Sequence, residues 1–258
     1  MPERTIRAAE VRDAPAGEAW HPGAPFADAP PAGAPLAGAP LWAGALEGGA
    51  LWAETLWAEA LGTRLCHDLA GPVGTLAGAV ELLAEAGGRD GEALEEAVRT
   101  ARELTARLRL LRAAWGGDCG DLDRGDIAAL LPGLAASGRV SVNLSGLNRR
   151  YPGPFARVLL NLVLLAVEAM PRGGAVALTD APCGGVLARI EGPRAGWPPA
   201  LAPLLAHGDP APPAVPEPRD VQAPLLVALA RRAGLRLSRV EAGAGSDAPP
   251  ALLLHGGG

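Results

Sequence analysis

The stretch RLCHDLAGPVG, residues 64–74, lies within a long segment whose apolar residues recur at helical spacing. At about 100° per residue, seven apolar side chains of this segment fall within one arc of roughly 120°. They are Leu61, Leu65, Leu69, Val73, Leu76, Val80 and Leu83. His67 lies roughly 175° from the centre of that arc. The spacing therefore predicts a helix over residues 50–86 that buries one face and presents an imidazole on the other.

Three glycines, Gly71, Gly74 and Gly78, share the helix face of His67. Glycine inside a helix costs about 1 kcal/mol relative to alanine, so three on one face call for an explanation. Either they form a smooth surface on which a partner docks around a reachable imidazole, or they belong to an ordinary solvated face. Pro72 removes the backbone hydrogen bond to the Asp68 carbonyl, which predicts a local bend just after His67.

Composition excludes several classes of protein. The formal net charge of −5 does not favour binding to nucleic acid. The most apolar run, residues 155–170, contains Arg157, Asn161 and Glu168, which argues against a membrane span. The first twenty residues lack the apolar core of a signal peptide. The three cysteines are widely spaced and fit neither a disulfide framework nor a zinc site, so we expect a cytoplasmic protein.

The chain divides into three regions by composition and periodicity. Residues 1–48 are rich in Ala, Gly and Pro and are predicted to be a flexible tail. Residues 49–116 predict a helical hairpin, in which Asp90 caps a second helix with heptad-like apolar spacing. Two helices with one apolar stripe each cannot close a core alone, so we expect a homodimeric four-helix bundle.

Residues 121–258 mix helical and strand patterns, as in an α/β sandwich with one sheet covered by helices. The predicted helices span 124–136, 154–170 and 221–233, and the predicted strands span 139–144, 175–179, 186–191, 235–240 and 251–255. The proline-rich segment 193–219 is predicted to be a loop. The whole chain is therefore expected to have an α+β fold.

Two motifs in this order resemble the conserved boxes of two-component histidine kinases. RLCHDLAGPVG resembles the H-box, and FARVLLNLVLLAVEAMPRGG, residues 155–174, stands where the N-box of the ATP-binding domain would be. Their combination is similar to the ChpT-type histidine phosphotransferases of alphaproteobacterial phosphorelays, over roughly residues 55–255. The resemblance implies a dimerisation and phosphotransfer hairpin followed by a degenerate histidine-kinase ATPase domain.

Three departures from the kinase pattern imply that this domain has lost ATP binding. Asn161 is present, but the second N-box asparagine is replaced by Leu165, which has no oxygen for a hard cation. The segment EGPRAG, residues 191–196, lacks the aspartate that would hold adenine. No glycine-rich phosphate loop precedes the helix that begins near residue 221. Asn161 is then either a remnant or a polar residue of helix packing.

The resemblance also implies a function and its residues. His67 would accept a phosphoryl group from the receiver domain of a hybrid histidine kinase (CckA-like). It would pass the group to response regulators (CtrA-like and single-domain receivers). Mg²⁺ would come from the receiver partner, and the chain itself would hold no cofactor or metal. Asp68 either orients or deprotonates the imidazole or is merely solvated, and Arg64 either contacts phosphoryl oxygens or solvates the helix.

The sequence is also compatible with two other functions. The chain would be a non-catalytic adaptor if it docks receivers without being phosphorylated, and an active histidine kinase if ATP labels it directly. The remaining histidines, His21, His207 and His255, have no acidic or cysteine companions at metal-ligand spacing, so they are poor candidates for a site.

Overall fold

The computed structural model describes residues 47–117, 119–134, 139–182, 184–206, 217–241 and 248–256, with side chains described from residue 55 onwards. Residues Leu46–Gly258 form one compact unit. The predicted tail 1–48 lies almost entirely outside the described residues, and the predicted boundary between residues 116 and 121 stays a prediction. No helix in these ranges combines the length and the apolar character needed to cross a membrane.

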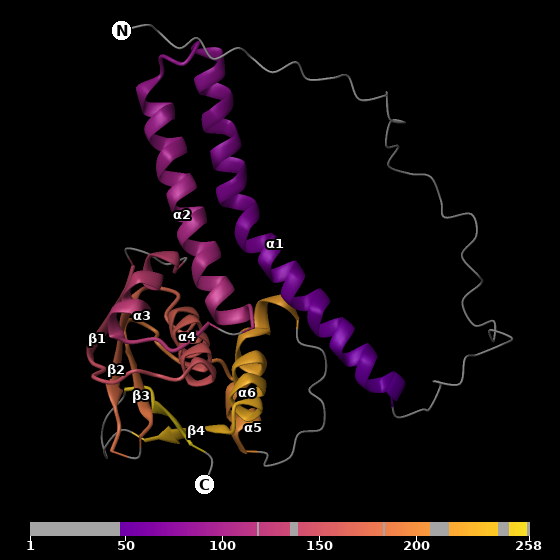
Figure 1. Ribbon diagram of the computed structural model, residues 1–258, viewed down its shortest axis with the longest axis vertical. Coiled ribbons are helices and arrows are strands. Elements are labelled where there is room, and N and C mark those ends of the chain that lie inside the picture. Colours follow the sequence, from indigo (N-terminus) through magenta and orange to yellow (C-terminus); the bar gives the residue numbers. More distant parts are fainter. Residues whose placement is uncertain are drawn as a thin grey trace, which may run out of the picture. The chain divides into compact units, whose positions relative to one another are not determined.

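The first two helices form the predicted hairpin and lie antiparallel, side by side (Figure 1). Helix α1 spans Glu47–Glu85 and α2 spans Gly91–Trp115. The turn between them contains Gly87 and Gly88 at positive φ, a conformation that glycine adopts without steric cost. The Asp90 side chain accepts a hydrogen bond of 3.0 Å from the Ala93 amide, which confirms the predicted cap. Helix α1 continues through Pro72 and changes direction along its length (Figure 1).

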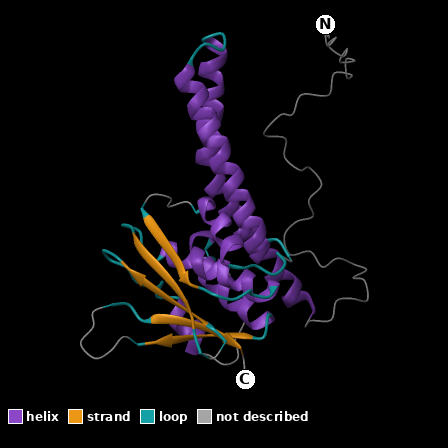
Figure 2. Ribbon diagram, turned by 60° about the vertical axis from the view of Figure 1, so that its left-hand side comes forward, coloured by secondary structure: helices purple, strands orange, loops and turns teal. Residues whose placement is uncertain are grey.

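The rest of the chain builds a five-stranded sheet with helices packed against it (Figure 2). The strands are β1 (Val140–Gly146), β2 (Gly174–Asp180), β3 (Val186–Glu191), β4 (Leu235–Val240) and β5 (Ala251–Gly256), in the order β1-β2-β3-β5-β4. Strand β1 pairs with β2 in parallel, and the other pairs are antiparallel. The helices are α3 (Arg124–Leu130), α4 (Gly153–Glu168), α5 (Leu201–Ala206) and α6 (Gln222–Arg232), with 3-10 turns η1 (Leu131–Gly133) and η2 (Pro218–Asp220). These elements confirm the predicted α+β fold.

Two sequence predictions about local structure were wrong. The segment 193–219 is not only loop, because α5 and η2 lie in its described part. Pro203 is tolerated in α5 because it stands in the first turn, where backbone amides have no partner within the helix. The helix predicted for 124–136 ends at Leu130, because Pro132 lacks the amide that would continue its hydrogen bonds.

The apolar stripe predicted on α1 is not buried within the single chain. Val73 and Val80 remain 52% and 50% exposed, whereas the small residues Ala60 and Ala79 are 5% exposed. The apolar residues of α2 are also incompletely buried, since Leu94 stays 49% exposed. The hairpin therefore leaves much of its apolar surface uncovered by its own chain.

Helix α4 forms the centre of the core, and its Asn161 is a fully buried polar residue. The Asn161 side-chain amide donates to the carbonyls of Ala114, at 2.8 Å, and Arg157, at 2.9 Å. Its carbonyl oxygen accepts from the Gln222 amide at 3.0 Å. These bonds join the end of α2, the middle of α4 and the start of α6. Asn161 thus proves to be a polar residue of helix packing.

Replacing Asn161 should strongly destabilise this packing. We expect Asn161→Ala to lower the free energy of unfolding by about 3 kcal/mol, because it removes three buried side-chain hydrogen bonds, two to the Ala114 and Arg157 carbonyls and one from the Gln222 amide. Urea unfolding followed by circular dichroism measures the change. The matched control is Asn148→Ala, which removes an exposed side chain with one hydrogen bond of 3.3 Å to the Gly146 carbonyl. Equal losses in the two variants would contradict the role of Asn161.

Candidate active site

His67 lies near the middle of α1 with its side chain 86% exposed. Its Nδ1 atom is 3.6 Å from Oδ1 of Asp68, the next residue along the helix. The imidazole is therefore a nucleophile that another protein can reach, and one edge of its ring faces a carboxylate. Cys66, on its other side, is also exposed.

Asp68 is held by two arginines from different helices. Its Oδ2 atom accepts a hydrogen bond of 3.0 Å from Nε of Arg64 and one of 2.8 Å from Nη2 of Arg107, on α2. The Asp68 side chain is only 14% exposed, so little water competes for these bonds. Both arginines engage Oδ2, which leaves Oδ1 as the oxygen nearest to His67.

Arg64 joins α1 to the C-terminal elements. Besides Asp68, its guanidinium donates to Oε1 of Glu168 at 2.6 Å and to the Arg219 carbonyl at 3.3 Å. Glu168 is the last residue of α4. Burial opposes the charge on Arg64, but the two carboxylates outweigh burial and raise the pKa of Arg64. Burial raises the pKa of Glu168, and the attraction of Arg64 offsets only part of this rise.

Sequence reasoning singled out Arg64, His67 and Asp68 and missed Arg107 and Glu168. The structure brings all five side chains to one place. The available signal for Glu168 was its position as an isolated acid at the end of an apolar run, where a partner is needed. Arg107 gave no comparable signal, because arginines are frequent along α2 and its partner is 39 residues away.

Residues of α1, α2 and η1 line a cleft of about 290 Å³ beside His67. Its lining includes Asp68, Gly71 and Pro72 from α1 and Arg107 from α2. There is space around the glycines of this helix: a Cβ atom added at Gly71, which lines the cleft, or at Gly74 or Gly78 would meet nothing within 4 Å. Packing inside the chain therefore does not explain these three glycines.

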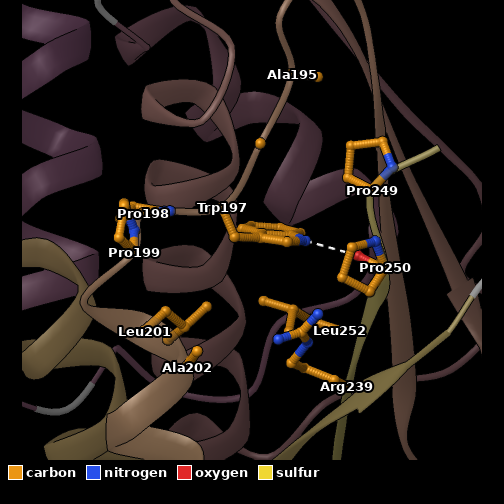
Figure 3. Close-up of a pocket in the computed structure, with 11 residues that line it drawn as sticks. Ala195, Trp197, Pro198, Pro199, Leu201, Ala202, Arg239, Pro249, Pro250 and Leu252 are labelled. Carbon is orange, nitrogen blue, oxygen red and sulfur yellow. Dashed lines mark hydrogen bonds between the residues drawn. The ribbon is translucent and has the colours of Figure 1, made fainter. Parts of the chain in front are cut away.

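Among the described residues, neither another histidine nor the cleft around Trp197 offers a competing site. His255, on β5, bonds through Nε2 to the Ser238 hydroxyl at 2.9 Å. His21 and His207 lie outside the described ranges. Within those ranges, no three His, Cys, Asp or Glu side chains gather as metal ligands. A cleft of about 350 Å³ around Trp197 is lined mainly by apolar side chains, and the Trp197 indole donates to the Pro250 carbonyl at 2.7 Å (Figure 3).

Comparisons with known proteins identify the family of this chain. A family model for the histidine phosphotransferase C-terminal domain matches residues 124–245. The chain is 31% identical over 185 residues to the protein phosphotransferase ChpT of Brucella abortus (strain 2308), with 69% of this chain and 87% of the relative covered. A solved structure described as a bacterial phosphotransferase is 25% identical, with a TM-score of 0.58 and coverage of 77% of this chain and 94% of that one. The chain belongs to the ChpT family and is a histidine phosphotransferase of a two-component phosphorelay.

Proposed function

We propose that His67 carries the phosphoryl group as a phosphohistidine between receiver domains. The donor would be the receiver of a hybrid histidine kinase, and the acceptors would be response regulators. The observation that carries this proposal is the 86% exposed imidazole with a fixed carboxylate beside one of its nitrogens. A reacting histidine in a protein-to-protein transfer must be reachable by a second protein, and His67 meets that requirement.

The arrangement of His67 and Asp68 suggests which ring nitrogen reacts. A proton on Nδ1 would face Asp68 Oδ1, leaving the lone pair of Nε2 free on the solvent side. Nε2 would attack the phosphorus of the receiver's aspartyl phosphate, forming an N–P bond while the P–O bond breaks and the carboxylate leaves. The reverse step, on another receiver, returns the imidazole to its starting state. Mg²⁺ bound by the receiver would cover the charge of the moving phosphoryl group.

Asp68 would act by orienting the imidazole. The 3.6 Å separation from Nδ1 is longer than a hydrogen bond, and a small rotation of the exposed ring would close it. The two arginines hold the carboxylate in place for this contact. Since the Arg64 guanidinium donates to Asp68, Glu168 and a carbonyl, we propose that Arg64 acts through Asp68 rather than on the phosphoryl oxygens.

We infer that ATP is not the phosphoryl source. Both amide hydrogens of Asn161 and its oxygen are engaged in buried hydrogen bonds, so the side chain does not fit the role of a ligand to Mg-ATP. Leu165, at the second N-box position, is fully buried. The degenerate domain then serves phosphotransfer through its contacts with the hairpin.

We also propose that the protein is cytoplasmic, because its widely spaced cysteines do not fit a disulfide framework.

Two labelling experiments test this function. Incubation with labelled ATP alone should leave the protein unlabelled. Incubation with a phosphorylated receiver should give an acid-labile label that His67→Gln abolishes. Labelling by ATP alone would instead identify a kinase, and binding of receivers without any label would identify an adaptor.

We also propose that the protein is a homodimer built on a four-helix bundle. Five exposed apolar side chains of α1 and α2 lie at positions of the predicted stripes. They are Val73, Val80, Leu94, Val98 and Leu108, each between 39% and 52% exposed in the single chain. Packing these residues against a second copy would remove them from water and supply the closed core that one hairpin lacks.

Sedimentation at micromolar concentration tests the dimer. The wild-type chain should sediment as a dimer, and Val80→Glu should sediment as a monomer because it places a charge in the apolar interface. Val240→Glu, on β4, is the matched control, because Val240 is an exposed valine outside the hairpin. A monomeric wild type, or a Val80→Glu variant that stays dimeric, would contradict the proposal.

The glycines beside His67 are proposed to form the floor of the receiver docking surface. We expect Gly74→Trp to reduce transfer from a phosphorylated receiver by about tenfold or more, through loss of at least about 1.4 kcal/mol of docking free energy. The fold should persist, because a Cβ atom at this position meets no other atom within 4 Å. Gly256→Trp also faces open space and serves as the control. Normal transfer by a folded Gly74→Trp variant would exclude this surface.

A further inference from the structure

Four charged side chains from three helices form a closed cluster behind His67. Arg64 and Asp68 belong to α1, Arg107 to α2 and Glu168 to α4. Their side chains are between 13% and 30% exposed. The cluster holds two positive and two negative groups, so each charge is compensated inside it.

Successive side-chain contacts link the C-terminal elements to His67. Glu168 Oε1 lies 2.6 Å from Arg64 Nη2, and Arg64 Nε lies 3.0 Å from Asp68 Oδ2. The other oxygen of Asp68 then faces His67 Nδ1 at 3.6 Å. Because arginine is a long side chain with many rotamers, one contact to Asp68 does not fix it. The second contact, to Glu168, gives the guanidinium a defined plane.

Helix α4 is a rigid base for this contact. Most of its residues are buried in the core, and Glu168 is its last residue. A side chain supported by a packed helix positions its partners more precisely than one on a loop. The Arg64 side chain is also anchored by the carbonyl of Arg219, next to α6. Both anchors come from the C-terminal elements and none from the hairpin itself.

We propose that Glu168 is a positioning residue for phosphotransfer, which fixes Arg64 so that Arg64 holds Asp68 Oδ1 toward Nδ1 of His67. This inference rests on the proposed function of His67. It assigns a specific task to the degenerate ATPase-like domain, which supplies Glu168 and so controls the protonation pattern of a histidine on another helix. The imidazole is kept with its proton on Nδ1 and its lone pair on Nε2, ready for the phosphorus.

Removal of the Glu168 charge should therefore change the histidine without touching it. In Glu168→Gln, Arg64 loses its charged anchor, so that only Arg107 still holds Asp68 firmly. Asp68 Oδ1 then turns more freely, and the His67 proton redistributes between the two nitrogens. We expect transfer from a phosphorylated receiver to slow by about tenfold, since misplacement of one positioning contact costs on this order. Glu168→Asp keeps the charge and should recover part of the rate.

The tautomer of His67 is the decisive readout, because a merely structural residue would not move it. The chain contains 4 histidines, so the nitrogen-15 spectrum of the histidine-labelled full chain is simple, and His67→Gln identifies the His67 signals. In the wild type we expect the signals of a ring protonated on Nδ1. In Glu168→Gln we expect the signals of a mixture. Glu241→Gln, which removes another ion-paired glutamate far from the cluster in sequence, should leave both spectrum and rate unchanged.

An unchanged His67 tautomer in folded Glu168→Gln would overturn the proposal, even if the rate falls. If that variant does not fold, Arg64→Lys disrupts the contacts to both Glu168 and Asp68 while keeping the charge. The same tautomer change is required of it. Failure of the proposed function would look different. It would appear as a receiver-dependent label that survives in His67→Gln, whatever the spectra show.

Discussion

The site depends on the ion pairs that the Asp68 carboxylate makes with the guanidinium groups of Arg64 and Arg107. A carboxylate that is 14% exposed is costly unless it is paired, and each arginine is in turn costly without the carboxylate. The three groups therefore stabilise one another in a single arrangement. That arrangement ties α1 to α2 at the level of His67, and through Glu168 it ties both to α4.

In the C-terminal domain, a residue of the kinase-like motif serves helix packing. Asn161 stands where a kinase would use an asparagine near Mg-ATP, yet here it closes hydrogen bonds between α2, α4 and α6. Packing of these helices places Glu168 at the end of α4, within 2.6 Å of Arg64. The position that resembles a nucleotide ligand thus serves the architecture, and its helix supports the charged side chains beside His67.

Local patterns were sufficient to predict most of the fold. Helical and strand periodicities, the cap at Asp90 and the glycine turn at Gly87 are properties of neighbouring residues, and they placed α1, α2 and the five strands. Periodicity could not predict α5, because its proline obscures a short helix. It also could not show that Val73 and Val80 stay exposed in one chain, since an apolar stripe looks the same whether its partner is in the chain or in a second copy.

The site was only half predictable for a related reason. His67 and Asp68 are adjacent in a motif, whereas Arg107 and Glu168 reach Asp68 and Arg64 over 39 and 104 residues. Contacts at such separations depend on the packing of three helices and leave no spacing signal. They leave Oδ1 of Asp68 as the oxygen that faces the imidazole.

The position of the phosphoryl group in the phosphorylated protein is the most direct test of whether Nε2 of His67 carries it. After transfer from a phosphorylated receiver, phosphorus-31 and nitrogen-15 spectra of the intact protein, with peptide mapping by mass spectrometry, locate the group. We predict a single phosphohistidine at His67, with the phosphorus bonded to Nε2. Phosphate on Nδ1 of His67, or on any other residue, would contradict it.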